Sequence, residues 1–249
     1  MIHVRVEGEG DPLLLLHASG LSGRQWGGRW RSLGPYRRIV PDLWGCGRSP
    51  GWPGPWPFRL ENDLIEVRRL LDQNGPCHVV GHSYGGCLAM MAAAERPERV
   101  RSVAVYEPPL MGRMALDPAM LEPIVREGDP ARWFERFVDW WNGPGAWASL
   151  PEPSRQAQLR SARECHGQVH DLLVEPWAPD RFRAVTAPVL VMHGTASPPL
   201  VHAALADLVS VLPNARRVVI EGQGHLAPVM AAEHLVPHVE RHLSRARNG

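Results

Sequence analysis

The stretch Val79–Gly86 constrains this chain more than any other, because it predicts a buried strand, a sharp turn and a helix in quick succession. β-branched residues open it, and the alanine-rich run Leu88–Ala94 that follows favours a helix. Between them, residues 81–85 read G-H-S-Y-G. The flanking glycines let the strand and the helix approach closely, so the hydroxyl of Ser83 stands clear of the backbone. The stretch therefore predicts a nucleophile, with the N–H of Tyr84 directed at a developing oxyanion.

The size and composition of the chain predict one large domain with an insertion. Its 249 residues are 44% hydrophobic and 21% charged, which is enough to bury a single sizeable core. The formal net charge is only +1, and the basic residues are scattered along the sequence. Because nucleic-acid binding needs clustered positive charge, we expect no nucleic-acid partner. A small-molecule substrate is the expected partner, and the sequence leaves the oligomeric state open.

Neither a membrane segment nor a metal site is expected. The N-terminal stretch MIHVRVE lacks the apolar region of a signal peptide, and no later apolar run is long enough to cross a bilayer. We therefore expect a cytoplasmic location and no membrane association. The four cysteines, Cys46, Cys77, Cys87 and Cys165, have neither the spacing of a metal site nor the density of a disulfide framework. Free thiols, with no cofactor and no metal, are the expectation.

Strands and helices alternate over much of the chain, which predicts a parallel sheet with helices on both faces. Residues 2–7 alternate like an edge strand, and a turn at residues 8–12 predicts a hairpin with the apolar strand 13–16. Ser22 is placed to cap a helix that extends to about Leu33. Further strands are expected at 38–41, 79–80, 100–106, 189–192 and 217–221, and further helices at 60–74, 88–94, 199–212 and 231–245.

This alternation stops between residues 110 and 179. No convincing strand is found there, and Asp-Pro pairs at 117–118 and 129–130 each place a capping residue before a first-turn proline. The segment also holds half of the ten tryptophans of the chain. We therefore expect residues 1–109 and 180–249 to form an α/β core, and residues 110–179 to form an inserted helical cap.

Four motifs give the chain a specific resemblance to a known family. They are His17–Gly20, Asp42–Ser49, the G-H-S-Y-G turn and Gly224-His225. In this order they resemble the oxyanion loop, the loop after the fourth strand, the nucleophile turn and the histidine loop of the α/β-hydrolase superfamily, of the serine hydrolase or esterase type with a helical cap. The resemblance covers nearly the whole chain. It implies the α/β-hydrolase fold, a mostly parallel central sheet with helices on both faces.

The resemblance also implies roles for individual residues. Ser83 is the expected nucleophile, and His225 is the expected base, on a loop after the last strand from which it can reach the serine. The N–H groups of the oxyanion hole are expected from Tyr84 and Ser19. Ala18 stands where family members usually have a glycine, which is a departure from the pattern.

The acid of the expected triad departs further from the family pattern. Most members place it after the seventh strand, in a H-G-x-x-D arrangement, but this chain has Ser197 at that position. Some members place the acid at the end of the sixth strand, where this chain has Glu107. Adjacent parallel strands lie about 4.8 Å apart and open onto one crevice, so Glu107 can reach the histidine. We predict Glu107 as the acid, with Asp42 and Glu221 as weaker rivals, and a nearly silent Ser197→Ala substitution.

Such a triad predicts acyl transfer to water. His225 deprotonates Ser83, Ser83 attacks a carbonyl carbon, and water hydrolyses the resulting acyl-enzyme. The expected substrate is a small to medium, largely apolar carboxylic ester. Aromatic residues at helical spacing in the cap, together with nearby methionines, are candidates for an apolar pocket. The residues predicted to bind substrate are Trp133, Phe137, Trp141 and Met111.

Other functions use the same residues. A lactonase, a thioesterase or a hydrolase of a carbon–carbon bond β to a ketone would employ the same triad, although the sequence shows no basic cluster for the phosphates of coenzyme A. A dehalogenase or epoxide hydrolase is disfavoured, because those family members need a carboxylate where this chain has Ser83. From another class, the fold also serves as a ligand receptor with little turnover, and the intact Ser83 and His225 argue against that function.

Overall fold

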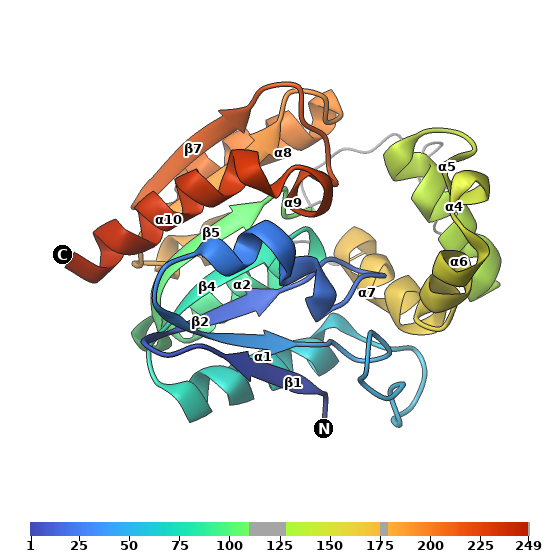
Figure 1. The fold of residues 1–249 in the computed structure, drawn as a ribbon, viewed down its shortest axis with the longest axis horizontal. Coiled ribbons are helices and arrows are strands. Elements are labelled where there is room, and N and C mark those ends of the chain that lie inside the picture. The colour runs from blue at the N-terminus through green and yellow to red at the C-terminus, as the bar shows by residue number, and fades with distance from the viewer. Residues whose placement is uncertain (110–127, 175–178, 249) are drawn as a thin grey trace.

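The central element of the molecule is a twisted sheet of seven strands (Figure 1). The computed structural model describes residues 1–109, 128–174 and 179–248. Within them the strand order is β1-β3-β2-β4-β5-β6-β7, with β1 antiparallel to β3 and every other neighbouring pair parallel. The strands are β1 (Val4–Glu7), β2 (Asp11–Leu16), β3 (Tyr36–Pro41), β4 (Cys77–His82), β5 (Val100–Tyr106), β6 (Val189–Gly194) and β7 (Ala215–Ile220).

The predicted hairpin between residues 2–7 and 13–16 is wrong. β3 lies between the two strands, pairing Ile39 with Leu14 of β2 and Val40 with Arg5 of β1. Burial explains this order. The four leucines that end β2 are all 0% exposed, so this strand takes a central place with both faces covered. β1 is only partly buried and forms the edge.

Helices cover both faces of the sheet and form two hydrophobic cores (Figure 1). Consecutive residues of β4, Val79 and Val80, belong to different cores, as the alternation of side chains along a strand requires. The first core includes residues of α1 (Leu60–Asn74), α2 (Tyr84–Glu95), η5 (Pro179–Ala184) and α8 (Pro199–Val211). The second includes residues of η1 (Gly23–Trp26), η2 (Gly28–Ser32), α9 (Ala227–Met230) and α10 (Ala232–Asn248). The short η3 (Pro97–Arg99) joins α2 to β5.

The single helix predicted from Ser22 to about Leu33 is instead the two short 3₁₀ helices η1 and η2. Ser22 does cap the first of them, since its hydroxyl accepts the N–H of Arg24. The interruption falls at Gly27 and Gly28, and Gly28 has a φ of +52°, in the left-handed region. Because a right-handed helix cannot continue through that conformation, the segment divides.

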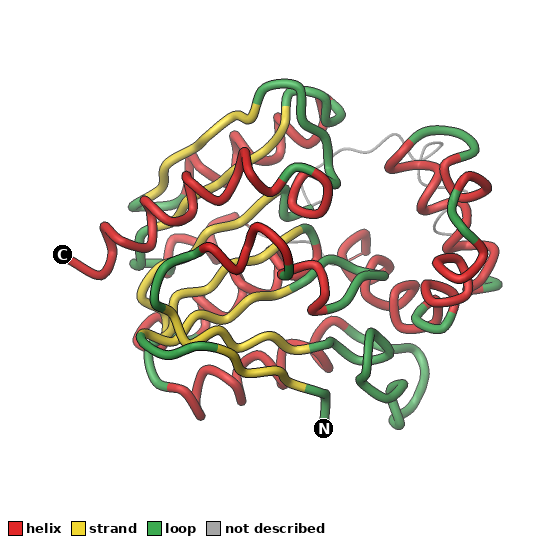
Figure 2. Tube along the Cα trace, viewed as in Figure 1, coloured by secondary structure: helices red, strands yellow, loops and turns green. Residues whose placement is uncertain are grey.

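Residues 130–174 form a separate layer of four helices, which we call the cap. They are α4 (Pro130–Asn142), α5 (Ala146–Ser149), α6 (Glu152–Leu159) and α7 (Ala162–Val174). Figures 1 and 2 show helices and loops here, beside the carboxyl ends of the parallel strands. As predicted, Asp129 caps α4 by accepting the N–H groups of Ala131 and Arg132. The Asp117-Pro118 cap lies outside the described residues.

Other predictions concern membranes, metals and thiols. Within the described residues, no helix combines the length and apolar character needed to span a lipid bilayer. The same residues contain no group of three or more His, Cys, Asp and Glu side chains arranged to hold a metal ion. All four cysteines are free and buried.

Candidate active site

The turn between β4 and α2 consists of one residue, Ser83. Its backbone has a φ of 52° and a ψ of −121°, a strained conformation for a residue with a side chain. A Cβ on Gly81 would lie 2.5 Å from the carbonyl oxygen of Gly85, and one on Gly85 would lie 2.3 Å from that of Leu16. These distances confirm the close approach that the two glycines predict. Only glycine fits at either position, and the turn lifts Ser83 to the carboxyl end of the sheet.

Three side chains from distant parts of the sequence meet at this turn. The Nε2 atom of His225, on the loop after β7, lies 3.0 Å from the Oγ of Ser83. The Nδ1 atom of the same ring lies 2.8 Å from the Oε2 of Glu107. Glu107 is only 1% exposed and Ser83 only 6%. The structure therefore brings together the three residues that the sequence predicts as a triad.

Glu107 is held from several sides at the end of β5. It has a φ of 45°, and among the described residues only Glu107 and Ser83 combine a positive φ with a side chain. Its Oε1 accepts the N–H of Gly194 at 2.9 Å and the hydroxyl of Ser197. Ser197, at the usual position of the acid, thus donates to the carboxylate that contacts His225. Because of this contact we now predict a moderate loss of activity for Ser197→Ala, in place of the nearly silent substitution expected from the sequence.

The rival acids lie elsewhere. Asp42 accepts the N–H of Gly23 at 2.7 Å and that of Arg48 at 2.9 Å, so it is bound to the loops around it. Glu221 accepts the hydroxyl of Thr195 at 3.3 Å near the surface. In the part of the chain that the structure describes, neither Asp42 nor Glu221 contacts His225.

The environment of Glu107 favours its charged form. Burial raises the pKa of Glu107, but the hydrogen bond and positive charge of His225, with hydrogen bonds from Ser197 and Gly194, outweigh burial. The pKa therefore lies below its ordinary value of 4.5.

This shift predicts how acid affects stability. A carboxylate whose pKa is lower in the folded than in the unfolded protein stabilises the fold above its unfolded pKa, and this contribution disappears as pH falls through the folded pKa. As the pH falls from 6 to below 4.5, which is about the pKa of a glutamate in an unfolded chain, we expect the free energy of unfolding to decrease more for the wild type than for Glu107→Gln. Urea unfolding across that range measures the difference. Parallel losses in both proteins would contradict the account.

The backbone of the histidine loop is fixed by two buried groups. The hydroxyl of Tyr106 donates to the carbonyl oxygen of Gly224 at 2.8 Å. The Nε2 of His82 lies 2.9 Å from the carbonyl oxygen of His225. Burial, followed by the charge of His225, holds the pKa of His82 well below its ordinary value, so this ring is neutral and donates through Nε2. Neither His82 nor Tyr106 is among the site residues predicted from the sequence, in which Tyr106 reads as the last residue of a strand.

Among the described residues, neither backbone N–H group predicted for an oxyanion hole has an acceptor. α2 begins at Tyr84, and its first helical hydrogen bond runs from the N–H of Cys87 to the carbonyl of Ser83. The N–H of Tyr84 therefore has no partner inside the helix. Ser19 lies on the loop after β2, and no described residue accepts its N–H, while its hydroxyl donates to Gln168 at 2.9 Å. Within the described part of the chain, both N–H groups are therefore available to bind a ligand.

The cap supplies one side of the site. The indole of Trp141, on α4, stacks on the imidazole of His225, with ring centroids 3.9 Å apart and planes 15° apart. Trp133 stacks on Phe137 at 4.9 Å, but Trp133 is only 1% exposed within the cap core. It offers no surface to a substrate, so we reassign Trp133 to packing of the cap. Met111 lies outside the described residues.

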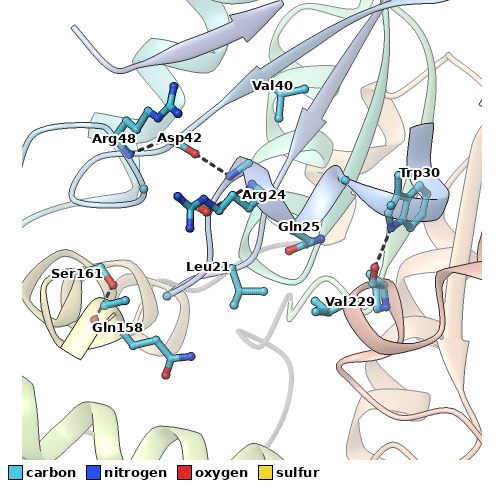
Figure 3. Close-up of a pocket in the computed structure, with 18 of the residues that line it drawn as sticks. Leu21, Arg24, Gln25, Trp30, Val40, Asp42, Arg48, Gln158, Ser161 and Val229 are labelled. Atoms are coloured by element: carbon cyan, nitrogen blue, oxygen red, sulfur yellow. Dashed lines mark hydrogen bonds between the residues drawn. The ribbon is translucent and has the colours of Figure 1, made fainter. Parts of the chain in front are cut away.

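Two cavities lie near these residues. The smaller, of about 230 Å³, is beside His225 and is also lined by Trp141, Ser197 and Gln223. The larger, of about 750 Å³, lies between the cap and the body and is lined in part by Leu21, but by neither His225 nor Ser83 (Figure 3). The arginines that are scattered in the sequence gather on its lining, namely Arg5, Arg24, Arg29, Arg48 and Arg160.

Comparisons with known proteins agree with this fold. Residues 13–236 match the model of the alpha/beta hydrolase family. Lipase LipV of Mycobacterium tuberculosis is 31% identical over 172 residues, which cover 64% of this chain and 60% of the lipase. The 2-hydroxy-6-oxo-6-phenylhexa-2,4-dienoate hydrolase of Burkholderia cepacia is 32% identical over 130 residues, which cover 49% of this chain and 45% of that hydrolase. These matches therefore span about half of each relative.

A solved structure covers more of the chain. A thermophilic esterase from Thermogutta terrifontis, with malate bound, has a TM-score of 0.73 and 25% sequence identity. The superposition covers 98% of this chain and 93% of the esterase. Since the family model extends over most of the sequence, the chain belongs to the alpha/beta hydrolase family.

Proposed function

We propose that this protein is a serine hydrolase that cleaves carboxylic esters through an acyl-enzyme. One observation carries the proposal: the continuous contact from Ser83 through His225 to Glu107, at 3.0 and 2.8 Å. A serine hydroxyl is a weak nucleophile at neutral pH unless a neighbouring base takes its proton as it attacks. The imidazole is placed for that transfer, and the carboxylate fixes its tautomer and balances its charge.

The reaction proceeds in two halves. Ser83 Oγ attacks the ester carbonyl carbon while its proton moves to Nε2 of His225, and the carbonyl oxygen becomes an oxyanion. When the bond to the alcohol breaks, His225 returns the proton to the leaving oxygen. Water then attacks the acyl-enzyme with His225 again as the base, which releases the acid and restores Ser83.

Two features support an oxyanion hole and a sheltered site. The free N–H groups of Tyr84 and Ser19 are the proposed donors to the oxyanion, and Tyr84 also stands at the positive end of the α2 dipole. Trp141 covers one face of the His225 ring, so the cap shields the base from bulk water.

The substrate that fits best is an ester with small or medium apolar groups. Trp141 presents an aromatic surface at the base, and Phe137 stands one helical turn before it on α4. The cavity beside His225, about 230 Å³, has room for a short acyl or alkoxy group. The names of two relatives, a lipase and an esterase, agree with ester hydrolysis.

A panel of p-nitrophenyl esters tests this function. We expect turnover numbers of about 1–10³ s⁻¹, the usual range for enzymes, with kcat/KM highest for short and medium acyl chains. The Ser83→Ala variant is the matched control for background hydrolysis. Wild-type rates equal to those of Ser83→Ala for every ester would overturn the proposal.

A second candidate function comes from the relative named as a 2-hydroxy-6-oxo-6-phenylhexa-2,4-dienoate hydrolase. The same triad would serve a hydrolase of a carbon–carbon bond beside a ketone. Adding such a dienoate to the ester panel separates the two functions. A higher kcat/KM for the dienoate than for the best ester would replace our proposal.

A further inference from the structure

A fully buried carboxylate contacts Tyr84, one of the proposed donors to the oxyanion. Asp63, on α1, is 0% exposed and accepts three hydrogen bonds. The N–H of Trp44 donates to its Oδ1 at 3.1 Å. The hydroxyl of Tyr84 and the Nε2 of Gln168 both donate to its Oδ2, at 3.0 and 2.8 Å. Asp63 therefore binds one residue of the proposed hole through its side chain.

Gln168 extends this contact to the other side of the hole. It comes from cap helix α7 and is also 0% exposed. Its Nε2 donates to Asp63, and its Oε1 accepts the hydroxyl of Ser19 at 2.9 Å. Using both ends of the amide fixes its orientation. Tyr84 and Ser19, whose N–H groups form the proposed hole, are thus joined through Asp63 and Gln168.

We propose that Asp63 and Gln168 are positioning residues that hold the two donors of the oxyanion hole in register, across the contact between cap helix α7 and the body. The inference rests on the proposed function. Oxyanion donors act over a narrow range of distances, and a displacement of about 1 Å can cost about 10²-fold in rate. A network that ties both donor loops together limits such displacement.

The burial of Asp63 agrees with a specific role. Desolvation raises its pKa to about 7, although its three hydrogen bonds lower the pKa, and the charge of Glu164 raises it further. A buried carboxylate without a cation is costly, and well-packed apolar side chains usually stabilise a core as well or better. Tyr84 and Gln168 both donate to Asp63, and an apolar side chain at this position could accept neither hydrogen bond.

Docking of the cap on the body is a separate role of α7, and another residue of this helix allows docking to be tested on its own. Asp171 accepts the N–H of Leu60 at 2.7 Å and a guanidinium N–H of Arg59 at 2.8 Å. These bonds also join α7 to the body, but they reach neither Ser19 nor Tyr84. Asp171 lies three positions after Gln168 on the same helix, so Asp171→Asn is a matched control that weakens docking alone.

The decisive variant is Gln168→Met, which keeps the length of the side chain and removes both hydrogen bonds. In full-length protein we expect kcat for the best ester to fall by about 10- to 100-fold, with little change in KM. The inhibition constant of an alkylboronic acid, which forms a tetrahedral adduct on the serine, should rise by a similar factor. Asp171→Asn should lower the melting temperature without either effect.

A second variant tests the same network if Gln168→Met does not fold. Tyr84→Phe removes one hydroxyl from the network and keeps the backbone N–H, so it should show the same pattern of lower kcat and weaker boronate binding. Wild-type kcat in both Gln168→Met and Tyr84→Phe would overturn the inference, and so would equal losses in Asp171→Asn. In both cases an active wild type leaves the proposed function intact, whereas an inactive wild type would remove the function itself.

Discussion

The His225→Ala variant is expected to lose about 10⁶-fold in kcat for the best ester. Without the imidazole at 3.0 Å, the hydroxyl of Ser83 has no base to take its proton. Ser83→Ala should lose about as much, and the double variant should lose no more than either alone, because residues that act as one unit are not additive. Steady-state and single-turnover rates on the same ester measure these losses.

A surface histidine provides the control for this variant. His234 is exposed near the start of α10, so His234→Ala should retain wild-type kcat. A loss in His225→Ala no larger than that in His234→Ala would show that the ring near Ser83 is not the base. Circular dichroism of each variant separates lost catalysis from lost folding.

The Glu107→Gln variant is expected to lose about 10⁴-fold in kcat. Glutamine keeps the shape of the side chain but removes the charge that holds the tautomer of His225 and balances the imidazolium. Asp42→Asn is the matched control, because Asp42 is also a buried carboxylate near a strand end, and its contacts are with Gly23, Arg48 and His3, outside the proposed triad. It should lower stability more than kcat.

The Ser197→Ala variant is expected to lose more kcat than Asp42→Asn and less than Glu107→Gln. Its hydroxyl donates to Glu107, so its loss leaves the carboxylate with one donor fewer and costs about 1 kcal/mol or a few-fold in rate. If Ser197→Ala or Asp42→Asn lowered kcat more than Glu107→Gln, the assignment of the acid would be wrong.

Much of the α/β core could be predicted because its signals are local. The apolar run of β2 and the G-H-S-Y-G turn each determine their own structure through a few neighbouring residues. The place of Glu107 follows from the chain order of the strands and from the family resemblance, and β5 ends where the sequence predicts. Parallel pairing of β4, β5 and β6 then brings the strand ends to one edge of the sheet.

The features that could not be predicted depend on distant contacts. The place of β3 between β1 and β2 is decided by burial of the whole sheet, which no local turn signal reports. Gln168 and Asp63 are 105 positions apart, and nothing in their helices marks them as partners. The stacking of Trp141 on His225 likewise depends on how the cap docks, so helical spacing groups Trp141 with Trp133, although Trp133 is buried in the cap.

Activation of Ser83 by His225 underlies the proposed reaction, and its sharpest test is the mass of the intact protein after treatment with a fluorophosphonate. We expect one adduct per wild-type chain, located on the peptide that contains Ser83, and no adduct in His225→Ala over the same time. An unmodified wild type, or equal labelling of His225→Ala, would contradict it.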